Sequence, residues 1–212
     1  MQNIDLGLLL RQRSLIDKLQ KYAKSKKTPI IGKHTGYFLE FAVMTVKPSN
    51  VLEIGCGNGF STYFILKNLN EGSKYTGIDM NKKRLFAARN FIGTEYPDSH
   101  HEFIWGNALK KLSNLDGIYD LIFIDAAKFE YPLYLAALKN KIKKGTLIIA
   151  DDIYCKGHLL SALPKKHFKN SVKGINIYLQ STSRKNGFDT WILDIDDGLS
   201  VSFYRRDSEI EK

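Results

Sequence analysis

The segment VLEIGCGNG, residues 51–59, decides the fold of this chain of 212 residues. Its apolar start indicates a short buried strand, its three alternating glycines a tight turn, and residues 61–69 behind it a helix. Glycines at such a turn let the backbone approach a ligand at the helix N-terminus, where the helix dipole favours carboxylate or phosphate. The spacing G-x-G-x-G is not the G-x-G-x-x-G of dinucleotide sites, so the segment predicts an α/β ligand site of another kind.

Strands and helices alternate from this segment onward. Four more apolar runs predict strands at 75–78, 103–105, 121–124 and 146–150, with helices at 82–96, after Asn107 and at 131–142. Two further helices are predicted ahead of the first strand, at 5–26 and 34–45. Continuous apolar strands separated by helices indicate a parallel sheet that is buried on both faces.

The last third of the chain departs from this alternation. A basic stretch at 156–173 leads into a helix through Leu179, and residues 190–195 and 199–204 flank Asp196-Asp197-Gly198 as a predicted hairpin. We therefore predict a single α/β domain over residues 1–212, with the helices of residues 1–48 packed on it. Its sheet should be doubly wound and mostly parallel, with an antiparallel hairpin at the C-terminal end.

Composition and charge limit the function. The 43% apolar and 25% charged residues are ordinary for a globular protein and exclude a disordered or membrane-spanning chain. The 32 basic residues against 22 acidic ones give a net charge of +10, which favours a polyanionic partner such as nucleic acid, unless the chain is simply rich in lysine. Cys56 and Cys155 are too few for a disulfide framework or a four-ligand zinc site. Asp5 and Arg11 interrupt the only apolar run at the N-terminus, which argues against a signal peptide. We expect a cytoplasmic protein without a membrane anchor.

Polar residues stand where the predicted strands end. Asp79 follows the second strand, where an acid can accept hydrogen bonds from ribose hydroxyls, and Asn107 follows the third, where an amide can contact adenine; helix capping is the alternative for both. Asp125 ends the fourth strand and Asp151-Asp152 end the fifth. These strands should be neighbours, and three converging carboxylates repel one another unless a cation or protons intervene. Oxygen ligands suit Mg²⁺, Mn²⁺ or Ca²⁺; the alternative is one Asp capping a helix and another facing water.

Lys128 follows Asp125 by three residues and should reach the same edge. Beside a divalent cation its ammonium would be destabilised and its pKa lowered, as a general base requires; the alternative is a solvated surface charge. The five histidines have no partner at metal-ligand spacing and are interpreted as structural or surface residues.

Several of these segments together resemble the cation-dependent O-methyltransferase family, which includes catechol and caffeoyl-CoA O-methyltransferases. The resemblance covers residues 28–204 and rests on VLEIGCGNGFST, YTGIDMN, GNAL, YDLIFIDAAKFEYPLY and GTLIIADDIYCKG, of which FIDAAK and DDI are the most specific. It implies the class I methyltransferase fold, S-adenosylmethionine as cofactor and a divalent metal, Mg²⁺ or else Mn²⁺ or Ca²⁺.

The resemblance also implies roles for individual residues. Lys128 is the implied base, Asp125 is catalytic with it, and the implied metal ligands are Asp125, Asp151 and Asp152. The implied cofactor-binding residues are Ile31, Glu53, Gly55, Gly57, Ser61, Asp79, Met80, Asn107, Ala108 and Asp125. The chain departs from the family pattern in having Asp152 where Asn is usual and Asn107 where Asp is usual. The extra charge at Asp152 should tighten the binding of a divalent ion.

In length and in its tail, DDGLSVS included, the chain is most similar to family members that convert tRNA wobble 5-hydroxyuridine to 5-methoxyuridine. This similarity and the basic clusters predict an O-methyltransferase that binds a tRNA anticodon stem-loop. The main alternative is an enzyme that methylates a small catechol-like phenol. A non-catalytic RNA-binding protein and a polyamine-synthase-like enzyme are further alternatives. The apolar surface of the N-terminal helices predicts a homodimer.

Overall fold

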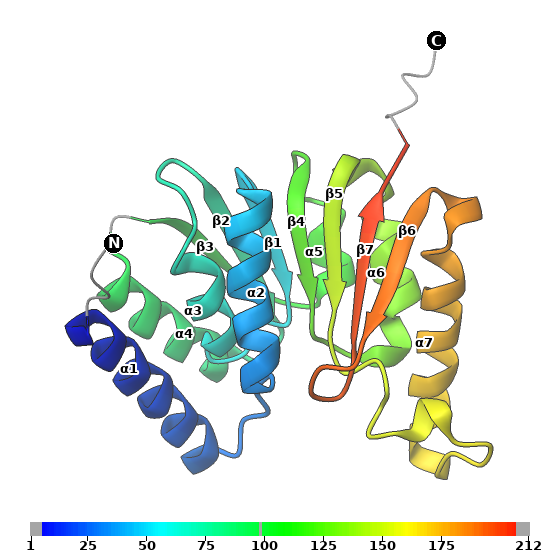
Figure 1. Cartoon of the computed structure of the whole chain (residues 1–212), viewed down its shortest axis with the longest axis horizontal. Helices are drawn as coiled ribbons and strands as arrows, with labels where there is room; N and C mark the ends of the chain where they lie inside the picture. The colour runs from blue at the N-terminus through cyan, green and yellow to red at the C-terminus, as the bar shows by residue number, and fades with distance from the viewer. Residues whose placement is uncertain (1–5, 98, 207–212) are drawn as a thin grey trace.

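A computed structural model describes residues 6–97 and 99–206 of the chain. Within them, seven strands form one sheet in the order β3-β2-β1-β4-β5-β7-β6 (Figure 1). The pairs from β3 to β5 are parallel, and β7 is antiparallel to both β5 and β6. The strands are β1 (Asn50–Ile54), β2 (Lys74–Asp79), β3 (His100–Trp105), β4 (Tyr119–Ile124), β5 (Ile142–Ala150), β6 (Phe188–Leu193) and β7 (Leu199–Tyr204). The predicted fold, a mostly parallel sheet with an antiparallel C-terminal end, is confirmed.

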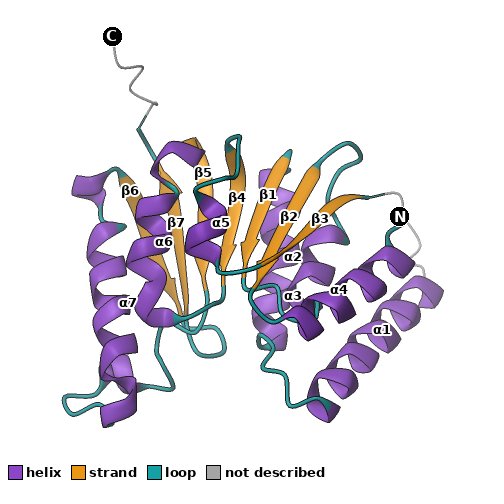
Figure 2. Ribbon diagram, turned by 180° about the vertical axis from the view of Figure 1, so that it is seen from behind, coloured by secondary structure: helices purple, strands orange, loops and turns teal. Residues whose placement is uncertain are grey.

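Helices cover both faces of the sheet and bury a separate apolar core on each. One core packs against α1 (Leu6–Ser25), α2 (Lys33–Val46), α3 (Phe60–Leu66) and α4 (Lys82–Glu95). The other packs against α5 (Ala108–Leu112), α6 (Tyr131–Ala137) and α7 (Lys169–Ser181), which Figure 2 shows from behind. Short 3₁₀ turns complete the chain at η1 (Lys128–Glu130), η2 (Lys139–Lys141), η3 (His158–Leu160), η4 (Lys166–Phe168) and η5 (Arg184–Asn186).

The predicted helix at 131–142 is too long, because α6 ends at Ala137 and Ile142 already belongs to β5. Ile142 is buried and pairs with Tyr119 of β4, ahead of a register shift in the two strands. The Thr146 hydroxyl holds this irregularity together, since it accepts from the amide of Lys143 at 3.0 Å and donates to the Tyr119 carbonyl at 2.7 Å. An irregular strand of this kind has no regular period-two pattern for sequence reasoning to detect.

Several other predicted boundaries move, among them two in the last third of the chain. Helix α7 begins at Lys169, inside the stretch predicted to precede it, and β6 covers 188–193 instead of 190–195. Strand β6 starts earlier because Phe188 is buried and its ring packs 4.9 Å from that of Tyr204. The predicted first helix agrees with α1, although residue 5 lies outside the described residues.

The turn of the β6–β7 hairpin also holds the start of α2. Asp196 in this turn accepts from the backbone amide of Thr35 at 2.8 Å and from its hydroxyl at 3.0 Å, and it contacts His34 Nδ1 at 3.0 Å. The carboxylate therefore caps an N-terminus whose own N-cap residue, Gly32, has no side chain to do so. This contact fixes the loop ahead of α2 beside the carboxyl ends of the strands.

No helix in the described part of the chain is long and apolar enough to span a membrane.

Candidate active site

A cavity of about 460 Å³ opens at the carboxyl ends of β1, β2 and β4. Its size falls within the range of small-molecule sites. It brings together nine of the residues that the sequence predicts for the site: Gly55, Gly57, Asp79, Met80, Asn107, Ala108, Asp125, Lys128 and Asp152. The prediction that these strand ends share one site therefore agrees with the fold.

Gly55 is the point at which two strand ends touch. Its φ is +97°, and a Cβ there would lie 2.0 Å from the carbonyl oxygen of Asp125. The Asp125 amide also donates to the Ile54 carbonyl at 2.9 Å. Only glycine allows this approach, which places the Asp125 side chain directly beside the glycine turn.

Asp79 is bound to the glycine turn by its own side chain. Its Oδ2 accepts from the Gly57 amide at 2.8 Å and its Oδ1 from the Asn81 amide at 2.7 Å. These bonds hold the carboxylate on the wall of the cavity, where hydroxyl groups of a bound nucleoside can reach it. The position is compatible with the ribose contact that the resemblance implies.

Asn107 does what the capping alternative predicts. Its side chain accepts from the Lys110 amide at 3.2 Å and so caps α5. The same residue and Ala108 also line the cavity, so capping does not remove Asn107 from the site. Met80 is among the more exposed apolar residues, and its carbonyl accepts from the Trp105 indole at 3.1 Å.

Glu53, Ser61 and Ile31 do not line this cavity. Glu53 is fully buried and accepts hydrogen bonds from three hydroxyls, those of Ser61, Thr62 and Tyr75. Burial raises the pKa of Glu53 to about 7, although these hydrogen bonds act in the opposite direction. The group underlies the glycine turn and binds β1 to β2 and α3.

Three carboxylates gather at the ends of β4 and β5. Oxygen atoms of Asp125, Asp151 and Asp152 all lie within 4.8 Å of one another. Asp151 is 1% exposed, and its Oδ1 has no hydrogen-bond partner among the described residues. Burial, and then the charges of Asp125 and Asp152, raise the pKa of Asp151 to about 8. A buried carboxylate oxygen without a donor, beside two further carboxylates, fits a divalent cation that prefers oxygen ligands.

Lys128 faces this cluster. Its Nζ lies 2.9 Å from Asp125 Oδ1 and 3.2 Å from Asp152 Oδ2. Burial lowers the pKa of Lys128, but Tyr131 and the two carboxylates outweigh burial and hold the pKa well above its usual value. This raised pKa is opposite to the lowered pKa that the sequence predicts for Lys128 beside a divalent cation. Lys128 thus reaches the same edge as Asp125, and its raised pKa keeps it protonated, so that it neutralises part of the acidic cluster.

Sequence reasoning missed several residues that line the cavity, among them Pro29, Ile30, Arg84, Glu130 and Tyr134. Pro29 and Ile30 reach it because the loop ahead of α2 is held there by Asp196, and no local signal shows this. Arg84 lies in the first turn of α4, three residues after the N-cap residue Asn81. Its position in the first helical turn after Asp79, the acid that ends β2, was the sequence signal that could have predicted it.

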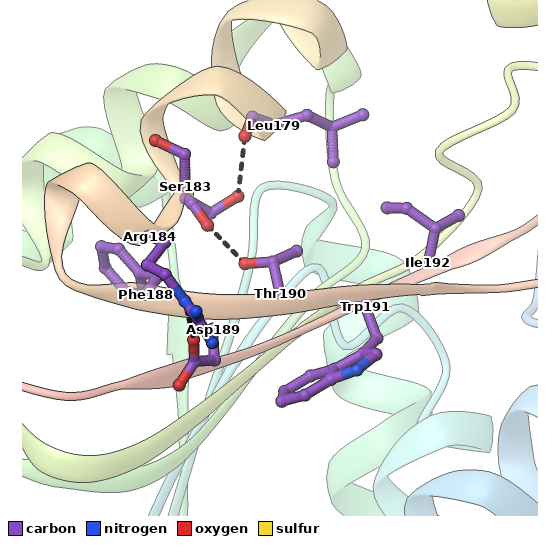
Figure 3. Close-up of a pocket in the computed structure, with 9 residues that line it drawn as sticks. Leu179, Ser183, Arg184, Phe188, Asp189, Thr190, Trp191 and Ile192 are labelled. Atoms are coloured by element: carbon purple, nitrogen blue, oxygen red, sulfur yellow. Dashed lines mark hydrogen bonds and ion pairs between the residues drawn. The ribbon is translucent and has the colours of Figure 1, made fainter.

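A second hollow lies beside the edge strand β6, and Figure 3 shows the residues that line it. The acid there, Asp189, is paired with Arg184 Nε at 3.1 Å and with Arg205 Nη1 at 3.2 Å. These contacts lower the pKa of Asp189 despite its slight desolvation. Because two arginines already neutralise Asp189, it is a weaker candidate for a catalytic or metal-binding group than the carboxylates at the ends of β4 and β5.

Comparison with known proteins gives a consistent family for this chain. The model of the O-methyltransferase family matches residues 10–205. A caffeoyl-CoA O-methyltransferase of Stellaria longipes is 26% identical over 96% of this chain and 88% of its own length. A catechol O-methyltransferase of Niastella koreensis is 28% identical over 61% of each chain. Among solved structures, an O-methyltransferase from Bacillus cereus in complex with SAH superposes with a TM-score of 0.82 at 23% identity, over 91% of both chains.

Proposed function

This chain belongs to the O-methyltransferase family, and on that premise we propose that it methylates tRNA wobble 5-hydroxyuridine with S-adenosylmethionine as donor. One observation carries the chemistry: the unpartnered Asp151 oxygen stands beside Asp125 and Asp152, next to a cavity of cofactor size. The product of this reaction would be 5-methoxyuridine.

The methyl donor is proposed to bind in the cavity beside the glycine turn. Gly55 and Gly57 give it backbone access, Asp79 accepts from the ribose hydroxyls, and Met80, Asn107 and Ala108 surround the adenine. S-adenosylmethionine supplies an electrophilic methyl group on a sulfonium centre. Glu53 and Ser61 act from behind the turn, which they hold in shape through their buried hydrogen bond.

The acidic cluster is proposed to hold a divalent cation, Mg²⁺ or else Mn²⁺ or Ca²⁺. Asp125, Asp151 and Asp152 are its proposed ligands, and the ion would supply positive charge that lowers the pKa of an acceptor hydroxyl. The φ of Asp152 is +53°, a left-handed conformation that Asp and Asn adopt more readily than most residues. Asp152 can therefore replace the usual Asn without a change of backbone, while it adds a negative charge.

Lys128 is proposed to take the proton that the acceptor hydroxyl loses. Its Nζ is oriented by Asp125 and Asp152, which keep it protonated when they have no other partner. It could act as a base only where another positive charge engages those carboxylates, so that the ammonium first gives up its own proton to solvent.

The choice of tRNA rests on charge. Lys165, Lys166 and Lys169 are exposed, at the N-cap and first residue of η4 and at the start of α7. Figure 1 shows the start of α7 beyond the carboxyl ends of the strands. A substrate that enters from this side approaches these positive charges, which can bind the phosphates of a nucleic-acid backbone. A small phenol carries no phosphates for these lysines to bind.

A catechol-like phenol is the second candidate acceptor. It is favoured by the relatives named above, one a caffeoyl-CoA and the other a catechol O-methyltransferase. Two adjacent oxygens on one ring are common to a catechol and to 5-hydroxyuridine with its neighbouring carbonyl, so the same acidic cluster could serve either.

The test is methyl transfer from labelled S-adenosylmethionine to tRNA that lacks the modification, beside a panel of catechols. Transfer to tRNA, with nucleoside mass spectrometry showing 5-methoxyuridine, supports the proposal; transfer to catechols alone overturns the acceptor. Replacing Lys165, Lys166 and Lys169 by Ala should weaken tRNA binding. It should also reduce the slope of the logarithm of the binding constant against the logarithm of the salt concentration by up to about 0.9 per lost phosphate contact. An unchanged salt slope would contradict this footprint.

We also propose a cytoplasmic homodimer. Helix α2 leaves Tyr37, Phe41 and Met44 exposed on neighbouring turns, an apolar stripe that a second copy could cover. Cys56 and Cys155 are both free thiols, which suits a reducing compartment. Light scattering of the protein and of a Phe41→Glu variant tests the dimer; a monomeric parent protein would contradict it.

A further inference from the structure

A separate cavity of about 530 Å³ lies between α1 and α4, and we name it the α1–α4 cavity. Its apolar wall consists of Leu15, Leu19, Tyr22, Phe86, Ala87 and Phe91. It shares no lining residue with the cavity at the carboxyl ends of the strands. Its volume is sufficient for a molecule of two or three rings.

The glycine turn contributes a polar group to this apolar wall. Asn58 lines the α1–α4 cavity, is 2% exposed, and its Nδ2 has no hydrogen-bond partner among the described residues. A buried amide donor without an acceptor is unfavourable, and a ligand with an acceptor atom would satisfy it. This unpartnered donor distinguishes the cavity from an ordinary gap between two helices.

The rim of the α1–α4 cavity selects the charge of the ligand. Lys18 and Lys83 are exposed members of its lining. Glu95 also lines it, but its carboxylate is paired with Arg11 at 3.5 Å. The rim therefore presents a net positive charge, complementary to an anionic group on an otherwise apolar molecule.

Asn58 also connects this cavity to the cofactor site. On one side of it, the Gly57 amide donates to Asp79 in the cofactor cavity. On the other side, a Cβ on Gly59 would lie 3.2 Å from Ala88 Cβ, so α4 packs directly against the turn. A ligand held between α1 and α4 that accepts from Asn58 would stabilise the turn in the conformation in which Gly57 and Asp79 are bonded.

We propose that the α1–α4 cavity binds an amphipathic aromatic anion that accepts a hydrogen bond from Asn58, and that this binding tightens the binding of S-adenosylmethionine. The binding of this anion, the binding half of the proposal, depends only on the α1–α4 cavity. Its effect on S-adenosylmethionine, the coupling half, rests on the proposed function, because it requires the cofactor to bind beside Gly57. Since coupling is reciprocal, the cofactor should tighten the ligand by the same factor.

The probe is 1-anilinonaphthalene-8-sulfonate, which joins two aromatic groups to an anionic acceptor. Fluorescence and calorimetric titrations of the full chain should show one saturable site. Ala87→Trp, which fills the cavity from a half-buried position on α4, should weaken binding at least tenfold. Asn58→Leu, which removes the donor at similar size, should weaken it roughly two- to tenfold.

Thr94→Trp is the matched control, because Thr94 is exposed on the same helix and does not line the cavity. It should bind the probe as the parent protein does, and circular dichroism should show that all three variants are folded. Equal binding by the parent protein and both cavity variants would overturn the site.

The coupling is measured as the Kd of S-adenosylhomocysteine with and without saturating probe. A decrease of about fivefold or more supports it. Probe binding that Ala87→Trp abolishes, together with an unchanged Kd for S-adenosylhomocysteine, overturns the coupling while the site stands. If S-adenosylhomocysteine does not bind at all, the proposed function fails, and the probe titration still decides the binding half.

Discussion

Glu53 in β1 and Asp151 at the end of β5 are both buried acids with raised pKa values, about 7 and about 8, yet their surroundings are opposite. Glu53 accepts from three hydroxyl groups of neighbouring elements. Asp151 has an oxygen without a donor and two further carboxylates within 4.8 Å. Burial alone therefore does not distinguish the two acids. The hydrogen-bond partners of each oxygen do.

The two acids should respond in opposite ways to removal of their side-chain oxygens. The hydroxyls around Glu53 need its oxygens as acceptors, so its loss should harm folding. The neighbours of Asp151 repel its charge, so its loss should spare folding and harm the chemistry. Four predictions test this contrast.

The largest effect is expected for Asp151→Ala. Under the proposed function, it removes one ligand of a divalent ion and should lower kcat about a thousandfold, or roughly 4 kcal/mol of transition-state stabilisation. Steady-state methyl transfer measures this, and Asp116→Ala, an exposed acid away from the cavity, is the control. Methylation at the parental rate by Asp151→Ala would refute the metal site.

Glu53→Leu should mainly reduce stability. The hydroxyls of Ser61, Thr62 and Tyr75 would lose a buried acceptor, which costs about 4 kcal/mol in total. Urea unfolding gives this value, and Glu53→Gln, which keeps one acceptor oxygen, should lose less. The contrast fails if Glu53→Leu is as stable as the parent protein.

The pH dependence of stability should reveal Glu53 as well. Its pKa is 4.5 without perturbation and about 7 in the folded protein, so the folded state binds more protons between these values. The free energy of unfolding therefore falls as pH rises from about 4.5 to 7, by up to about 3 kcal/mol for this group. Unfolding curves of the parent protein and of Glu53→Gln across this range isolate the contribution. Parallel curves would mean that Glu53 does not titrate there.

The smallest effect is the stabilisation by a bound ion. Mg²⁺ at ten times its Kd should raise the free energy of unfolding by about 1.4 kcal/mol, and a chelator should remove the gain. Asp151→Asn should abolish this gain and, in chelator, unfold at a higher temperature than the parent protein, because Asn needs no proton to avoid repulsion by Asp125 and Asp152. Glu53→Gln should keep the gain. Equal stabilisation of Asp151→Asn by Mg²⁺ would place the ion elsewhere.

Much of the candidate site was predictable because it depends on strand order alone. Parallel strands end at one edge of the sheet, so Asp79, Asp125 and Asp151 were expected along that edge once the strands were recognised, with Asp125 and Asp151 as neighbours. Lys128, three residues after Asp125, had to follow. Hydrophobic runs and glycines are local signals, and they were sufficient for the sheet and for the place of its ligand site.

The sequence by itself thus determined the parallel sheet, its antiparallel end and the acids that meet at its edge, because each follows from residue types at short spacing. Only the tertiary structure decided that Glu53 lies behind the cavity with Tyr75 as its partner, and that Asp196 caps α2, 161 residues away from Thr35 along the chain. It also decided that Ile30 lines the cavity while the neighbouring Ile31 is buried elsewhere. Hydrogen-bond partners and cavity walls come from segments remote in sequence, and local patterns do not record which remote segments pack together.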